Sequence, residues 1–250
     1  GLTSEADALF EKIAGQANFY GNLADEELGR KTPTPPKARA PTAEEQKATR
    51  DNPAIRRAMA FFRLDMRTEA VREWNWSLRG MDDRELLAAA DLARRNQIWD
   101  RAINTADRTR SEHDFTLRYL APYGDQVRSA AQNQSLDDAW VYGLMRQESR
   151  FITVAKSKVG ARGLMQLMPA TARQTAPAAG VTYDLLSLTK DPQHNMRLGS
   201  TYFGQLMTTY GGSYVLSVAA YNAGPGNVNK WIRANGDPRT PGVDPVNWIE

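Results

Sequence analysis

The chain contains no cysteine and only two histidines, His113 and His194, which lie far apart in the sequence. The absence of cysteine excludes a disulfide framework, a cysteine nucleophile and a cysteine-ligated zinc ion. Neither histidine has metal-ligand spacing around it, so we expect no metal site, no histidine-dependent catalytic triad and no cofactor. No uncharged apolar run approaches the roughly 18 residues of a membrane span, so no span is expected.

The chain also has little excess of one sign of charge, because its net charge is only +3 in 250 residues. There is no basic run and no basic stripe interleaved with aromatic residues, so nucleic acid is not an expected partner. The content of 41% hydrophobic and 24% charged residues is ordinary for a globular protein and excludes wholesale disorder. No signal peptide is visible, and Gly1 in place of methionine indicates a mature or trimmed product.

Proline and helix-capping patterns divide the first half of the chain. Four prolines between residues 31 and 41 predict an extended connector, and the stretches 6–15 and 23–29 before it predict short helices. From residue 42 to about residue 123 the pattern is helical throughout. Asn52-Pro53 predicts a helix start, and Asp82 with Glu85 predicts a capping box.

Stacked antiparallel helix pairs are the architecture expected for this region. Trp74, Trp76 and Trp99 could form a set that stacks on a ligand, but buried anchors between helices are the favoured interpretation. After residue 124 glycines become frequent and helices alternate with shaped loops, one helix beginning at Asp191-Pro192. Few stretches alternate apolar and polar residues, so the predicted fold class is all-α.

One glutamate lies where a surface helix would place an apolar residue. A capping box of Ser135 and Asp138 predicts a helix start, and the apolar stripe that begins at Val141 ends seven residues later in Glu148. Burial and the negative end of the helix dipole both raise the pKa of a carboxyl group, as a general acid requires. The alternative is a glutamate at the edge of the stripe that pairs with arginine or caps a neighbouring helix, and this segment alone favours that alternative.

Two further segments change the balance. The glycine-punctuated loop 156–163 suits close approach of the backbone to a ligand, and Gln166 follows it among methionines. Tyr221 and Asn222 precede a tight turn at residues 224–226. With Glu148, these groups describe a cleft with one acid, amide and hydroxyl groups, and apolar walls that suit a neutral ligand such as an N-acetyl sugar.

The motifs Glu148-Ser149, Ser157-x-x-Gly-Ala-x-Gly-Leu-Met-Gln-Leu-Met-Pro169 and Ala219-Ala-Tyr-Asn-Ala-Gly-Pro225 together resemble the soluble lytic transglycosylase (Slt) family. The resemblance implies a goose-lysozyme-like, mostly helical catalytic domain after superhelical and linker helices. We therefore expect the end of a superhelical domain with a Pro-rich connector at 1–42, a helical linker domain at 43–124 and a lysozyme-like domain at 125–250.

The resemblance also implies an activity. Family members cleave the MurNAc-β-1,4-GlcNAc bond of peptidoglycan without water and leave a 1,6-anhydromuramoyl end. Glu148 would be the catalytic acid and then the base, and Tyr221 would lie near the acetamido group or the acid. The remaining positions that match cleft-lining residues of the family are Ser157, Gln166, Met168 and Asn222.

No second carboxylate occurs in a comparable motif, since Asp184 resembles a loop residue and Asp191 an N-cap. Most glycosidases use two carboxylates, and a one-acid mechanism needs no second. Two departures from the family stand out: Ile152 replaces a common asparagine, and the segment expected after Val246-Asn-Trp-Ile-Glu250 is missing. We expect a chain truncated at its C-terminus.

The resemblance places the protein in the periplasm with peptidoglycan glycan strands as its partner, and it leaves the oligomeric state open. Two other functions remain to be separated from this one. The first is a hydrolytic muramidase of the same fold, and the second is an inactive module that only binds glycan strands.

Overall fold

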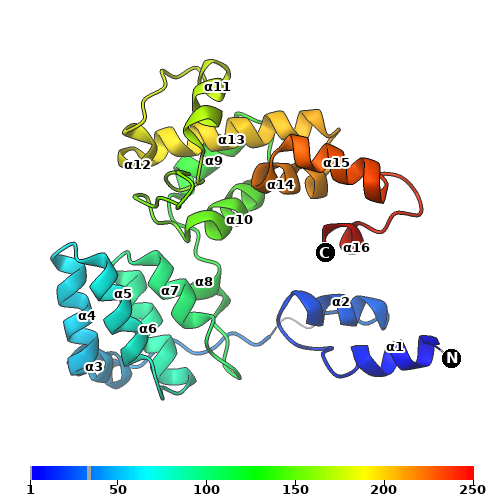
Figure 1. Ribbon diagram of the computed structural model, residues 1–250. Coiled ribbons are helices and arrows are strands. Elements are labelled where there is room, and N and C mark those ends of the chain that lie inside the picture. The colour runs from blue at the N-terminus through cyan, green and yellow to red at the C-terminus, as the bar shows by residue number, and fades with distance from the viewer. Residues whose placement is uncertain (1, 33–34) are drawn as a thin grey trace. The chain divides into compact units, whose positions relative to one another are not determined.

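The computed structural model describes residues 2–32 and 35–250, and it confirms the all-α prediction (Figure 1). Among the described residues the only β-type pairings are three isolated bridges. The chain divides into two compact units, residues 1–120 and 121–250. The first unit contains α1 (Leu2–Phe10), α2 (Phe19–Glu27), α3 (Ala43–Asp51), α4 (Pro53–Arg63), α5 (Arg67–Ser77), α6 (Asp83–Arg95), α7 (Trp99–Ala106) and α8 (Phe115–Arg118).

Helix pairs build the core of the first unit. Helix α4 packs against α5 and α6 packs against α7, and small alanines on α6 allow close approach of the neighbouring helices. Trp74 is completely buried between these pairs, and its Nε1 donates a hydrogen bond to Thr105 Oγ1 at 2.9 Å. The interpretation as a buried anchor is correct for Trp74 and wrong for Trp76, which is 61% exposed. Trp76 lies two residues after Trp74 on the same helix, so its side chain points away from the face that buries Trp74.

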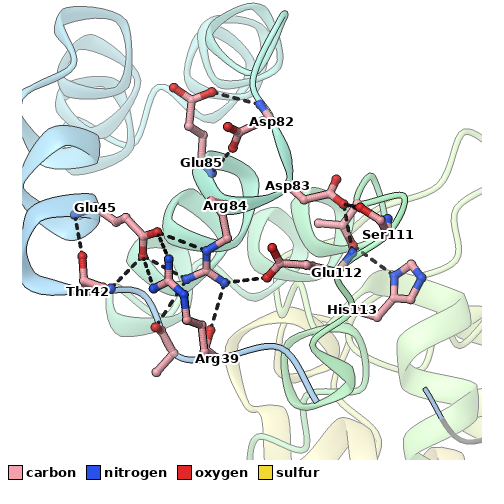
Figure 2. Close-up of polar contacts among 12 residues, drawn as sticks. Arg39, Thr42, Glu45, Asp82, Asp83, Arg84, Glu85, Ser111, Glu112 and His113 are labelled. Carbon is pink, nitrogen blue, oxygen red and sulfur yellow. Dashed lines mark hydrogen bonds and ion pairs between the residues drawn. The ribbon is translucent and has the colours of Figure 1, made fainter. Parts of the chain in front are cut away.

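A network of charged side chains holds the connector against this unit (Figure 2). The Arg84 guanidinium on α6 binds the carboxylate of Glu45 at 2.9 Å, that of Glu112 at 3.0 Å and the backbone oxygen of Arg39 at 3.1 Å. Asp83, next to it, accepts hydrogen bonds from three consecutive backbone amides, those of residues 110–112. Against the effect of burial, the amide hydrogen bonds hold the pKa of Asp83 well below its usual range. The guanidinium groups of Arg84 and Arg39, which both bind Glu45, lower the pKa of Glu45 in the same way. The end of the connector, α6 and the loop before α8 are thereby joined.

Helix starts follow the predicted caps in three cases and depart from them in one. Asn52, Asp82 and Asp191 cap α4, α6 and α13 as predicted. The predicted capping box at Ser135 is wrong, because Asp137 caps the helix and Ser135 has a left-handed φ of 53°. Helix α10 begins only at Asp138, so Asp137 takes the N-cap position, with the extended backbone that is typical there. The two predicted N-terminal helices form a few residues earlier than expected. The part of the predicted connector at Pro33 and Thr34 lies outside the described residues.

The second unit surrounds the long helix α13. This helix packs against α9, α11, α12 and α14, and two buried clusters fill the spaces around it. The helices of this unit are α9 (Gly124–Gln132), α10 (Asp138–Ser149), α11 (Pro169–Ala179), α12 (Ser187–Lys190), α13 (Pro192–Thr209), α14 (Tyr214–Ala223), α15 (Pro225–Asn235) and α16 (Pro245–Ile249). Across the described part of the chain, every helix is too short or too polar to cross a bilayer.

Candidate active site

Glu148 occupies the last turn of α10, as the apolar stripe predicted. Val141, Leu144 and Met145 on the same helix are buried, and Glu148 continues their face but keeps partial exposure. Among the described residues, no ion pair or hydrogen bond reaches its carboxylate. Burial therefore acts alone, and it raises the pKa of Glu148 above its ordinary value.

The carboxyl group opens into a cleft with a volume of about 700 Å³. Four helices of the second unit, α10, α14, α15 and α16, supply its walls. Two of the predicted site residues, Glu148 and Asn222, line it. Ser157, Gln166, Met168 and Tyr221 are not among its lining residues.

Tyr221 lies behind the cleft wall and interacts electrostatically with the acid. Its hydroxyl donates a hydrogen bond to Met165 O at 2.8 Å, and its ring packs 5.4 Å from that of Tyr202. Burial of the hydroxyl, together with the negative charge of Glu148, raises the pKa of Tyr221 well above its usual range. The phenol is therefore a hydrogen-bond donor at any physiological pH, close enough to Glu148 for the two groups to influence one another.

Side chains from three helices fix the loop that carries Gln166. The Ser149 hydroxyl on α10 donates a hydrogen bond to Leu164 O at 2.7 Å, and the Tyr221 hydroxyl on α14 donates one to Met165 O. Asn195 on α13 is completely buried and binds this loop twice, accepting from Met165 N at 2.8 Å and donating to Arg162 O at 3.0 Å. The loop is thus held in one conformation next to the end of α10.

Gln166 uses its amide nitrogen within this loop. Its Nε2 donates to Gly163 O at 2.8 Å and to Ala155 O at 3.3 Å, and its backbone has a left-handed φ of 46°. Non-glycine residues with such a φ are uncommon and tend to occur at functional sites. Ser157 instead closes a turn, since its Oγ accepts from Ala161 N at 3.0 Å. Met168 precedes α11 and is 40% exposed.

The cleft also contains residues that the sequence reasoning missed. Trp140, Trp231 and Trp248 line it, and they come from three different helices. The Trp140 ring stacks on Tyr214 with 4.0 Å between centroids. Trp140 and Trp248 lie in or near segments that the sequence singled out for other reasons, but Trp231 does not, so a one-dimensional pattern could not have grouped the three. Flat aromatic faces of this kind suit the apolar faces of sugar rings.

A second carboxylate, that of Glu250 on the last residue, lines the same cleft. Asp184 and Asp191 do not, because the first accepts from the Ser187 backbone and hydroxyl at 2.7 Å and the second caps α13. Within the described part of the chain, no three acidic or histidine side chains gather in a way that could hold a metal ion. The chemistry available in the cleft is that of one desolvated acid, amides, aromatic rings and the Glu250 carboxylate.

Known proteins are similar to this chain in sequence and in fold. Residues 125–241 match the family described as "Transglycosylase SLT domain", and residues 48–111 match "Soluble lytic murein transglycosylase L domain". The chain belongs to the soluble lytic transglycosylase family. The SLT domain therefore contains Glu148, Gln166 and Tyr221, and the L domain contains Arg84.

The soluble lytic murein transglycosylase of Escherichia coli (strain K12) is 27% identical over 233 residues, which are 93% of this chain and 36% of that protein. The membrane-bound lytic murein transglycosylase C of Edwardsiella ictaluri is 32% identical over 116 residues, 42% of this chain and 32% of that protein. An inactive Glu-to-Gln mutant of lytic transglycosylase Slt from Pseudomonas aeruginosa superposes with a TM-score of 0.81 at 34% identity, covering 98% of this chain and 39% of that one. The chain thus spans between about a third and two fifths of the length of these relatives, and the SLT domain has the lysozyme-like helical fold of the solved Slt structures.

Proposed function

We propose that this chain carries the catalytic machinery of a peptidoglycan lytic transglycosylase that acts in the periplasm. Its substrate would be the β-1,4 bond between N-acetylmuramic acid and N-acetylglucosamine, and its product a 1,6-anhydromuramoyl end. The observation that carries the proposal is the half-buried carboxyl of Glu148 in an aromatic-lined cleft, with a pKa raised by burial. The relatives' names and the inactive Glu-to-Gln mutant of one of them support it.

Glu148 acts twice in the proposed mechanism. As an acid it gives its proton to the glycosidic oxygen while the C1–O bond breaks and the substrate's acetamido oxygen supports C1. The resulting carboxylate then accepts the proton of the C6 hydroxyl, and O6 forms the new bond to C1. The proton thus returns to Glu148, no water is consumed, and one carboxyl group suffices.

Tyr221 and the fixed loop would position the groups that react. The Tyr221 hydroxyl keeps its proton and holds Met165 O, the carbonyl next to Gln166, so the loop that carries Gln166 stays fixed. The negative charge on Glu148 in the second half of the reaction is disfavoured by the same burial that raised its pKa. That carboxylate is therefore a stronger base than an exposed one.

Mass spectrometry of products from purified sacculi tests the proposal. We expect muropeptides lighter by the mass of one water than those with a reducing end, and a loss of about 10²–10⁴-fold in rate in Glu148→Gln. Because the folded-state pKa is raised, the charged carboxylate costs stability at neutral pH, so Glu148→Gln should melt at the same temperature as the wild type or higher.

Glu250→Gln is the matched control, since it makes the same chemical change in the same cleft. We expect it to keep the anhydro product and most of the activity. If the wild type instead releases products with a reducing end, and both Glu148→Gln and Glu250→Gln abolish them, the protein is a hydrolytic muramidase with two carboxylates. A wild type that binds sacculi and releases nothing would indicate a glycan-binding module.

A further inference from the structure

A second cavity, in the L domain, is lined by arginine. It has a volume of about 670 Å³ and lies along α4, with α3 and α6 at its sides. Four of its ten lining residues are Arg50, Arg56, Arg57 and Arg63, and none is acidic. The spacing places Arg56 and Arg63 two turns apart on the same side of α4.

Most of this positive charge is not neutralised within the described part of the chain. Arg57 pairs with Glu73 at 2.7 Å, whereas Arg50, Arg56 and Arg63 form no ion pair there. The acidic neighbour, Asp51, is already bound to Lys47, which lowers the pKa of Asp51 more than Arg50 or Arg56 does. The cavity therefore keeps an excess of exposed guanidinium groups, each able to bind a carboxylate through two parallel hydrogen bonds.

The floor of the cavity is apolar. Ile55 and Met59 are buried beneath the arginines and belong to the core of this unit. A ligand that fits must therefore combine several anionic groups with small apolar ones. The absence of aromatic residues among the lining side chains disfavours single-stranded nucleic acid, which stacks its bases on aromatic rings.

We propose that this arginine-lined cavity binds the carboxylate-bearing stem peptides of peptidoglycan, so the L domain is a substrate-binding module. A stem peptide alternates alanine methyl groups with free carboxylates, which matches an apolar floor with guanidinium groups around it. A few residues of such a peptide fit a volume typical of ligand sites. The inference rests on the proposed substrate, and it adds a binding site for the peptide that is separate from the residues that cleave the sugar bond.

The test measures binding of the free peptide L-Ala-γ-D-Glu-meso-diaminopimelate-D-Ala to the full chain by NMR, with no turnover. We expect saturable shifts of α4 amides in the wild type and a loss of at least about tenfold in affinity when Arg50, Arg56 and Arg63 are all changed to Glu. Because these three side chains are exposed, the variant should fold, and its circular dichroism and melting temperature check this.

The matched control changes three exposed arginines outside the cavity, Arg72, Arg110 and Arg128, to Glu. This variant has the same net charge and should bind the peptide as the wild type does. Equal losses in both variants, equal binding of a DNA oligonucleotide, or no shifts at millimolar peptide would each overturn the inference. Peptide binding is measured without cleavage, so its result does not depend on catalysis. If Glu148→Gln left the release of products unchanged, that would contradict the proposed function, and the binding data would still decide whether the cavity binds the peptide.

Discussion

At the scale of single residues, the site depends on a glycine that no other residue can replace. Gly163 has φ 77°, and a Cβ atom there would lie 2.0 Å from Leu188 O and 2.3 Å from Asn195 Nδ2. Its carbonyl accepts the Gln166 amide, and its own amide donates to Ala155 O at 2.9 Å. The loop can therefore pass this close to α12 and α13 only without a side chain.

Gly163→Ala should destabilise the SLT domain by about 3 kcal/mol or more, because backbone strain and steric overlap add. Gly160 is the matched control, since its φ is 97° and nothing lies within 4 Å of its Cβ position. Gly160→Ala should cost only about 1–2 kcal/mol of conformational strain. Urea denaturation followed by circular dichroism measures both, and equal costs would show that the close approach to Leu188 does not matter.

The sequence was informative about single residues where a periodic pattern was broken. Glu148 interrupts an otherwise apolar stripe, and the structure places it half-buried in a cleft. Trp231 and Trp248 could not be found in this way, because each fits the ordinary pattern of its own helix. Only the packing of α15 and α16 brings the two rings within 6.4 Å and into the same cleft.

At the scale of elements, the loop between α7 and α8 depends on a neutral histidine. Arg118 is buried and donates from Nη2 to His113 Nδ1 at 2.7 Å and to Thr109 O at 3.1 Å. The backbone of His113 in turn accepts from Ala38 N, so the connector is attached to this loop. Burial and the positive charge of Arg118 lower the pKa of His113, because a second cation would face the first.

This geometry predicts a loss of stability in mild acid. With the folded-state pKa below the unfolded value, the unfolded chain binds more protons, so stability is full above about pH 6.5 and falls as the pH drops through the folded pKa. His113→Asn keeps an acceptor for Arg118 and removes the titration, so its melting temperature should depend less on pH between 7 and 5. Parallel pH profiles for the two proteins would contradict the predicted role of His113.

Helix starts show how far local signals extend. Asn52-Pro53 and Asp191-Pro192 combine a capping side chain with a proline, and both signals favour the same residue. Ser135 and Asp137 compete for one helix start, and the left-handed backbone at Ser135 decides between them. The backbone conformation of Ser135 belongs to the turn that follows α9. The capping pattern carries no information about that turn.

At the scale of the whole molecule, each unit contains its own buried core. Two clusters of the first unit involve residues between 38 and 120, and two of the second involve residues between 167 and 248. The bonds that hold the Gln166 loop also come entirely from the second unit. The residues that line the Glu148 cleft and the bonds that fix the Gln166 loop therefore both belong to residues 121–250.

A fragment of residues 121–250 should consequently fold by itself and unfold cooperatively, with the urea midpoint of the matching transition in the full chain. It should release the same anhydro product from sacculi, because Glu148 and the cleft are complete within it. It should not bind the free stem peptide through the arginine-lined cavity, since Arg50, Arg56 and Arg63 are absent from it. A fragment that lacks a cooperative transition would show that the core of the second unit is insufficient alone, and a fragment that still bound the peptide with full affinity would locate peptide recognition in the SLT domain.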